Sequence, residues 1–207
     1  MNDKVTEDYF PEITIYADGS CLRNGSEEAS AGCGAVIVDR NREELRLISR
    51  HLGSLTNQQA EISACTTALG TLRRPCIVEI VSDSKYVVET MTGKHGMKSN
   101  RSFWTDLVKR CYRHHVSWRW VRGHSGVMFQ EAADRLSRAA STYQCSLPDE
   151  ELQRLSKLLL LESNQLNIRA FEKSLEATVS RYSLSVDCGN VLSNVDLRND
   201  LPSAFST

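Results

Sequence analysis

The order of apolar and polar positions predicts three short strands at the start of the chain. Apolar residues alternate with small or polar ones over residues 13–18, 32–39 and 44–52. A period of two indicates half-buried strands, and three of them joined by short connections indicate an antiparallel meander. The first strand ends at Asp18, and the polar stretch 19–31 is expected to be a turn region. A carboxylate at the tip of a core-facing strand needs a compensating partner.

After this meander the apolar period changes to that of a helix. Asn57 is a suitable N-cap for a helix over 58–72, and Pro75 prevents that helix from continuing. The largely apolar run 76–83 is typical of a central strand. The pattern then predicts a helix, a second helix, a strand and a final helix over residues 84–91, 103–114, 116–121 and 128–143. The order βββαβααβα indicates an α/β layered fold with a mixed sheet flanked by helices.

The chain divides by composition into three parts. Residues 1–12 are expected to be a flexible leader, 13–143 the main domain, and 144–207 a helical, partly disordered C-terminal extension. Within the extension, a helix over 149–161 has four leucines on one face, and a weaker helix is predicted over 165–178. The Ser- and Asn-rich end, 183–207, is expected to be poorly ordered. The extension is either a small element for self-association or for a protein partner, or an unimportant tail, and the sequence leaves both open.

Composition excludes several classes of protein. The seven cysteines are odd in number and contain no CxxC pair, which argues against a disulfide framework or a zinc ribbon and fits the cytoplasm. No apolar run approaches the roughly 20 residues of a membrane span, and the polar start is not that of a signal peptide. The net charge is −1, yet residues 93–124 carry eight basic residues, one acid and interleaved aromatics. That segment is either a surface for a polyanion or a solvated basic face.

Four carboxylates form the candidate site. Asp18 and Asp83 end two strands that would share one sheet edge if they are parallel neighbours, and Glu61 and Asp134 lie on helices that can face the same edge. Four acids so close would repel each other unless divalent cations neutralised them. Oxygen ligands favour Mg²⁺ or Mn²⁺, and two such ions about 4 Å apart suit phosphodiester cleavage. His124, in a glycine-flanked loop before the last helix, is a candidate proton shuttle.

These residues belong to motifs that resemble the type 1 ribonuclease H family. The resemblance is collinear over residues 13–143. It is carried by Tyr16-Ala17-Asp18-Gly19-Ser20-Cys21 with Asn24, by Gly32 and Gly34, by Thr56-Asn57-Gln58-Gln59-Ala60-Glu61, by Asp83-Ser84-Lys85-Tyr86-Val87, by Trp120-Val121-Arg122-Gly123-His124-Ser125-Gly126, and by Glu131-Ala132-Ala133-Asp134-Arg135-Leu136. These groups of residues in this order are together far more specific than any one of them.

The resemblance implies a five-stranded mixed sheet with strand order 3-2-1-4-5. It also implies an endonuclease that cuts the RNA strand of RNA–DNA hybrids and leaves 5′-phosphate and 3′-hydroxyl ends. By the family pattern the four carboxylates hold two Mg²⁺ ions, with Mn²⁺ as the alternative, and His124 assists turnover by moving protons. The same pattern implies two groups of substrate contacts: Asn24, Asn57 and Gln58 on ribose 2′-hydroxyls, and Thr56 and Asn100 on a phosphate of the DNA strand.

The sequence departs from the family pattern in three places, one of which is the absence of a Gly-Pro-Gly after Asn24. The loop 92–100 is short and lacks the paired tryptophans of a longer basic protrusion, so Lys94, Lys98 and Arg101 are its local substitutes. Gln130 stands where an Asn is often found. Two alternatives remain: a DNA nuclease or transposase of the same fold, and a non-catalytic module that binds hybrids. The 2′-hydroxyl readers argue against the first, and the complete acid set against the second.

Overall fold

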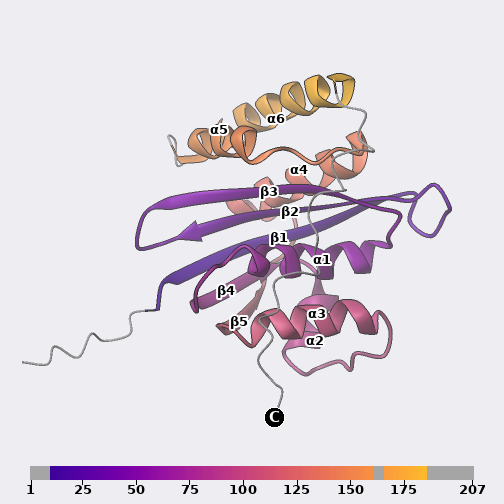
Figure 1. Ribbon diagram of the computed structural model, residues 1–207, viewed down its shortest axis with the longest axis vertical. Helices are drawn as coiled ribbons and strands as arrows, with labels where there is room; N and C mark the ends of the chain where they lie inside the picture. Colours follow the sequence, from indigo (N-terminus) through magenta and orange to yellow (C-terminus); the bar gives the residue numbers. More distant parts are fainter. Residues whose placement is uncertain (1–9, 161–165, 186–207) are drawn as a thin grey trace, which may run out of the picture.

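The computed structural model describes residues 10–160 and 166–185 of the chain. The expectations for a flexible leader and for a poorly ordered end fall mainly on residues 1–9 and 186–207, outside this range. Within the described range, the sheet lies between two groups of helices (Figure 1). The predicted order βββαβααβα is confirmed, and two helices of the extension follow it.

The sheet has the expected strand order, β3-β2-β1-β4-β5. Antiparallel pairing joins the first three strands, and parallel pairing joins β1 to β4 and β4 to β5. Their bounds are β1 Glu12–Leu22, β2 Ser30–Asp39, β3 Glu44–Gly53, β4 Ile77–Ser82 and β5 His115–Trp120. The prediction that β1 ends at Asp18 is wrong. The strand continues because it keeps pairing with β2 as far as Leu22 beside Ser30, which shortens the turn to residues 23–29.

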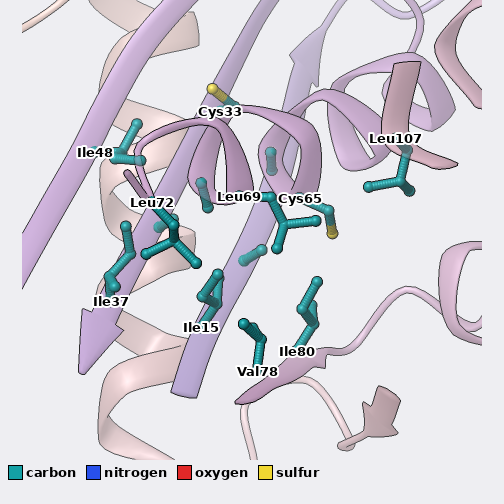
Figure 2. Close-up of a cluster of buried hydrophobic side chains, with 14 of the residues drawn as sticks. Ile15, Cys33, Ile37, Ile48, Cys65, Leu69, Leu72, Val78, Ile80 and Leu107 are labelled. Carbon is teal, nitrogen blue, oxygen red and sulfur yellow. The ribbon is translucent and has the colours of Figure 1, made fainter. Parts of the chain in front are cut away.

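One face of the sheet is covered by α1 (Asn57–Gly70), α2 (Lys85–Met91) and α3 (Arg101–Cys111). Figure 2 shows the core there: isoleucines and Val78 from the strands meet Cys65 and Leu69 of α1, Leu72 just after α1, and Leu107 of α3. The prediction of Asn57 as N-cap is wrong. Thr56 caps α1, since its hydroxyl accepts from the Gln59 backbone N–H while the Gln59 side chain accepts from the Thr56 N–H. The helix predicted over 103–114 is also shifted, beginning at Arg101 and ending at Cys111.

The opposite face is covered by α4 (Met128–Tyr143), and outside it lie α5 (Asp149–Leu160) and α6 (Leu166–Ser185) (Figure 1). Buried apolar side chains from these three helices form a second core with β2 and β3, in which Phe171 and Leu155 are almost fully enclosed. The prediction that poor order begins at Ser183 is wrong for the first residues of that segment, because α6 continues to Ser185.

The chain between α4 and α5 also covers the outer edge of the sheet. The backbone N–H of Leu147 donates to the Ser49 carbonyl at 3.1 Å, and the N–H of His51 donates to the Ser146 hydroxyl at 3.0 Å. These contacts use part of the hydrogen-bonding capacity on the open edge of β3. That edge is therefore less available to pair with a strand of another chain. The described part of the extension is therefore packed onto the α/β core.

Contact between α4 and the sheet is unusually close at Gly34 on β2. A Cβ atom added at this glycine would lie 2.2 Å from the backbone carbonyl oxygen of Ala133. Such a distance cannot be relieved by a side-chain rotation, because the obstructing atom belongs to the helix backbone. The absence of a side chain at Gly34 therefore lets α4 lie directly on β2, one residue from Asp134.

Among the described residues, no helix is both long enough and apolar enough to cross a membrane.

Candidate active site

Three carboxylates meet at one edge of the sheet. Parallel pairing of β1 with β4, with Tyr16 beside Val81, leads both strands toward this edge. Asp18 lies on β1 just beyond the paired stretch, Asp83 directly follows β4, and Glu61 lies in the second turn of α1. One carboxylate oxygen from each residue lies within 4.8 Å of the other two. The structure thus brings together three of the four predicted acids.

The convergence of Glu61 on Asp18 depends on a backbone contact at Gly19. A Cβ atom on this glycine would lie 2.2 Å from the Glu61 backbone nitrogen and 2.4 Å from the Ala60 carbonyl carbon. The Gly19 N–H also donates to Oε2 of Glu61 at 3.1 Å. Because Gly19 has no side chain, α1 approaches β1 closely enough to place one carboxylate beside the other.

The fourth acid, Asp134, lies beside this trio but outside the 4.8 Å group. It lines a small pocket at the same edge, together with Asp83, His124 and Gln130. Gln130, the residue that replaces the usual Asn, is buried and donates from Nε2 to the Ala17 carbonyl at 3.2 Å. This bond joins the first turn of α4 to β1, next to Asp18, so the longer amide still ties the helix to the site.

Ser137 is a site residue that sequence reasoning missed. It is fully buried on α4 and donates a short hydrogen bond from its hydroxyl to Oδ2 of Asp18. Its position three residues after Asp134 places both on one face of a helix, and that spacing was the available signal. A serine in an apolar helix pattern is a weak signal by itself, because such hydroxyls usually bond to their own helix.

Electrostatics make this cluster unfavourable without a compensating charge. Burial, with contributions from Asp83 and Asp134, raises the pKa of Asp18 from 3.8 to about 8, although the Ser137 hydrogen bond opposes the shift. Burial and the neighbouring carboxylates of Asp18 and Asp83 also raise the pKa of Glu61 well above its ordinary value. The pKa of Asp134 is raised by burial and lowered in part by Arg138 and His124. Buried carboxylates that repel one another and converge on one point are suited to bind hard divalent cations, which neutralise their charge.

The backbone is constrained at both Asp83 and His124. The Trp120 indole N–H donates to the Asp83 carbonyl oxygen at 2.9 Å, a contact that sequence reasoning missed because it depends on the pairing of β4 with β5. His124 is exposed and has a left-handed backbone, with φ of 53°. Such a conformation is uncommon for a residue with a side chain and is found where surrounding contacts enforce it.

The five predicted substrate-contacting residues gather around the N-terminus of α1. Asn24 accepts through Oδ1 from the Asn57 backbone N–H at 3.0 Å. Asn100 donates from Nδ2 to Oε1 of Gln58 at 3.4 Å and to the Tyr86 hydroxyl at 3.2 Å. Asn24, Thr56, Asn57 and Gln58 are exposed, so their free polar groups face solvent near the carboxylate edge.

The basic segment 93–124 does not form one surface. Lys94 and Lys98 are exposed on the loop before α3, near its N-terminus and hence near Asn100. At the other end of α3, Arg113 donates to the Arg73 carbonyl at 3.4 Å. Arg119 makes a two-bond ion pair with Glu79 at 3.0 and 3.1 Å. The sequence was compatible with a polyanion surface and with a solvated basic face. In the structure these basic residues lie on the loop before α3, after α3 and on β5.

Comparison with known proteins agrees with this fold and site. A family model described as RNase H matches residues 11–142, so the chain belongs to the RNase H family. The chain is 36% identical over 141 residues to a ribonuclease H of Phenylobacterium zucineum, and the match covers 62% of this chain and 89% of the relative. It is 37% identical over 142 residues to a ribonuclease H of Bradyrhizobium diazoefficiens, and that match covers 62% of this chain and 88% of the relative.

A solved structure is similar over the same region. It is that of LC9-RNase H1, described as a type 1 RNase H with the type 2 active-site motif. The similarity has a TM-score of 0.58 and 27% identity, and covers 67% of this chain and 75% of the other. The predicted resemblance to the type 1 ribonucleases H is confirmed by these matches. The helices α5 and α6 lie beyond the residues that the family model matches.

Proposed function

We propose that this protein is a metal-dependent endoribonuclease that hydrolyses the RNA strand of RNA–DNA hybrids. The observation that carries the proposal is the convergence of Asp18, Glu61 and Asp83 to within 4.8 Å at the edge where α1 presents its polar N-terminus. Membership of the RNase H family and the two ribonuclease H relatives support the same reading.

Each residue of the site has a role in this proposal. Asp18, Glu61 and Asp83 hold divalent cations, and Asp134 contributes from the adjoining pocket. When bound, such ions lower the pKa of an attacking water and stabilise the charge on the leaving oxygen. His124 lies beside Asp83 and Asp134 and moves protons near the leaving group. Hydrolysis with the 3′ oxygen as the leaving group produces a 5′-phosphate and a 3′-hydroxyl.

The ions are two Mg²⁺ in this proposal, with Mn²⁺ as the alternative. All the ligands are carboxylate oxygens, and neither cysteine nor histidine belongs to the described cluster. This donor set suits hard ions rather than zinc. Titration of the protein with each ion, read by calorimetry, would show two sites for Mg²⁺ or Mn²⁺ and weak binding of Zn²⁺, and one site would contradict the two-ion form.

Selection of RNA follows from the polar groups at the start of α1. Asn24, Asn57 and Gln58 contact 2′-hydroxyls, and Thr56 and Asn100 hold a phosphate of the DNA strand. Two hydrogen bonds support this. The Asn57 backbone N–H donates to Oδ1 of Asn24 and so holds the Asn24 side chain at the start of α1, and Nδ2 of Asn100 donates to Oε1 of Gln58 and so holds these two side chains together.

A cleavage assay tests the activity. Labelled RNA–DNA hybrid, duplex DNA, duplex RNA and single strands are incubated with Mg²⁺ and the protein. We expect cleavage of the hybrid RNA alone. The Asp83→Asn variant should lose activity by about a thousandfold or more, since it removes one charge from the cluster. Asp106→Asn, an exposed acid on α3, is the matched control and should cleave as the wild type does.

The other outcomes of the assay favour other functions. Cleavage of duplex DNA would favour a DNA nuclease or transposase-like enzyme of the same fold. Binding of hybrid without cleavage would favour a non-catalytic module. Activity retained by Asp83→Asn would contradict the assignment of the site.

Two further points belong to the proposal. The first is a cytoplasmic location, supported by the free thiols of the six cysteines in the described part of the chain.

The second is self-association or binding of a protein partner through residues 145–207, in addition to the catalytic role of 13–143. Exposed Leu158 and Leu160 on α5 support it. Sedimentation of the wild type and of a Leu158→Ser, Leu160→Ser variant would show a difference in mass if the leucines mediate association.

A further inference from the structure

The C-terminal helix α6 makes a charged contact with the helix that carries Asp134. Oε2 of Glu172 on α6 lies 3.3 Å from Nε of Arg135, the residue that follows Asp134 on α4. Phe171, next to Glu172, is fully buried against the same helix layer, which fixes this part of α6 in place. A helix beyond the matched RNase H region therefore touches the helix of the active site through a specific ion pair.

Arg135 links that contact to a second carboxylate. Its Nη1 donates to the Glu131 backbone carbonyl at 3.0 Å and lies 3.6 Å from Oε2 of the Glu131 side chain. The side chains of Arg135 and Glu131 are 21% and 23% exposed, so water screens this pair less than a surface pair. The guanidinium thus lies between one carboxylate from α4 and one from α6.

Glu131 in turn holds the loop that carries His124. Its Oε1 accepts from the Gly126 backbone N–H at 3.1 Å. His124 and Gly126 both have left-handed backbones, with φ of 53° and 82°. Gly126 adopts this conformation freely, but His124 carries a side chain and keeps it only where surrounding contacts enforce it. The Glu131 carboxylate supplies such a contact just two residues after His124.

We propose that Glu172 is a positioning residue for His124, acting through Arg135 and Glu131. While Glu172 occupies one side of the guanidinium, Arg135 is shared between two carboxylates. Without it, Arg135 pairs more fully with Glu131, and the carboxylate of Glu131 is drawn away from Gly126. The extension then contributes to catalysis as well as to packing. The catalytic part of this inference rests on the proposed function.

A charge-removing variant with a matched control tests the inference in kinetics. Glu172→Gln keeps the size of the side chain and removes its charge, and Glu176→Gln does the same at an exposed position one turn later on α6. We expect Glu172→Gln to lower kcat about three- to fivefold with KM nearly unchanged, the size of effect given by a partly exposed ion pair. Glu176→Gln should match the wild type. Equal kcat values for the two variants would overturn the inference.

A double-mutant cycle with His124→Ala separates positioning from a general structural effect. If Glu172 acts through the loop, Glu172→Gln should cause little further loss of kcat when His124 is absent. A general effect on folding or on metal binding would instead lower kcat by the same factor in both backgrounds, and that result would overturn the inference.

Amide hydrogen exchange at Gly126, measured by NMR, gives a readout that needs no activity. Exchange should be faster in Glu172→Gln by about threefold or more and unchanged in Glu176→Gln, because only the first variant weakens the Gly126–Glu131 bond. If the wild type cuts no hybrid, the proposed function fails while this measurement still decides the link. Unchanged exchange in Glu172→Gln would overturn the link itself.

Discussion

The two faces of the sheet deliver their acidic side chains by different means. On the α1 face, Glu61 reaches Asp18 because backbone meets backbone at Gly19, where an added Cβ would lie 2.2 Å from a helix atom. On the α4 face, Asp134 lies outside the 4.8 Å group, and side chains such as Ser137 connect its helix to the site. Both helices lie close to the sheet, since α4 also meets β2 at Gly34, but only on the α1 face is the close backbone contact made by a residue of the acidic cluster itself, Glu61. Substitutions at the Gly19–Glu61 contact should therefore have abrupt effects, and those of side chains that join α4 to Asp18 graded ones.

Gly19→Ala should have the largest effect on activity. The new methyl group cannot be accommodated unless α1 moves away from β1, which separates Glu61 from Asp18. We expect a loss of about 3 kcal/mol in unfolding free energy and at least about a hundredfold in cleavage rate. Urea unfolding and hybrid cleavage measure the two effects.

Gly96→Ala is the control for this substitution. Gly96 lies in the exposed loop before α3, and a Cβ there would meet only the Lys98 side chain at 3.9 Å. This variant should keep both stability and activity. If Gly19→Ala behaved like Gly96→Ala, steric fixing of the α1 face would be wrong.

Phe171→Ala on α6 comes next, because its effect is expected on stability and not directly on cleavage. Phe171 is fully buried in the second core with Leu155 and Leu175, so its removal leaves a cavity. The expected loss of unfolding free energy is about 3–5 kcal/mol. Leu160→Ala, at a position that is 48% exposed, should change stability by less than about 0.5 kcal/mol. A small effect of Phe171→Ala would mean that the extension is not part of the folded core.

The sequence was sufficient for the sheet and for the acids on strands. Alternation, turn residues and motif order place Asp18 on the first strand and Asp83 at the end of the fourth, and the parallel pairing of β1 with β4 then brings them to one edge, although β1 continues beyond Asp18. The N-cap of α1 was assigned one residue too late, although Thr56 and Gln59 have the spacing of a capping box. The sequence contains this capping-box spacing, but Asn57 is also a favoured N-cap residue, so the sequence alone offers two candidates.

The packing of the extension could not be read in the same way. The apolar residues Ile168, Phe171, Leu175 and Val179 recur at helical spacing, which predicts a buried face but not its partner. The contacts of Ser137 with Asp18 and of Glu172 with Arg135 join residues 119 and 37 positions apart in the chain, and they follow only once α4 is placed on β2. Propensity and periodicity are local, and these contacts are not.

Metal removal should change the pH dependence of stability through Asp18. Its pKa is raised from 3.8 to about 8 in the folded state, so the folded protein binds more protons than the unfolded chain between these pH values. Unfolding free energy of the metal-free protein should therefore fall as pH rises through this range. Mg²⁺ binds the ionised carboxylates, so its stabilisation should grow with pH, raising Tm by about 5 °C or more near pH 8 and less near pH 5.

Scanning calorimetry with Mg²⁺ and with a chelator measures this effect. Asp18→Asn is the matched variant, because it keeps the shape and cannot ionise. It should show a flatter dependence on pH without metal and little gain from Mg²⁺. A Tm of the wild type that Mg²⁺ raises equally at both pH values would contradict the linkage between ionisation and metal binding.

Ser137→Ala on the α4 face should have the smallest effect of the four, and a graded one. The Ser137 hydroxyl stabilises the ionised form of Asp18 and so lowers its pKa; without it, that pKa rises further. A shift of about one unit would raise the Mg²⁺ concentration for half-maximal cleavage about tenfold near pH 7 and only about twofold near pH 9, where Asp18 is at least half ionised in either protein. Ser141→Ala, at a buried serine one turn later on α4 that bonds to Ser20, should leave the Mg²⁺ requirement unchanged. An increase of the same size at both pH values would show that Ser137 acts by placing α4, in the steric manner of the α1 face, and not through the charge of Asp18.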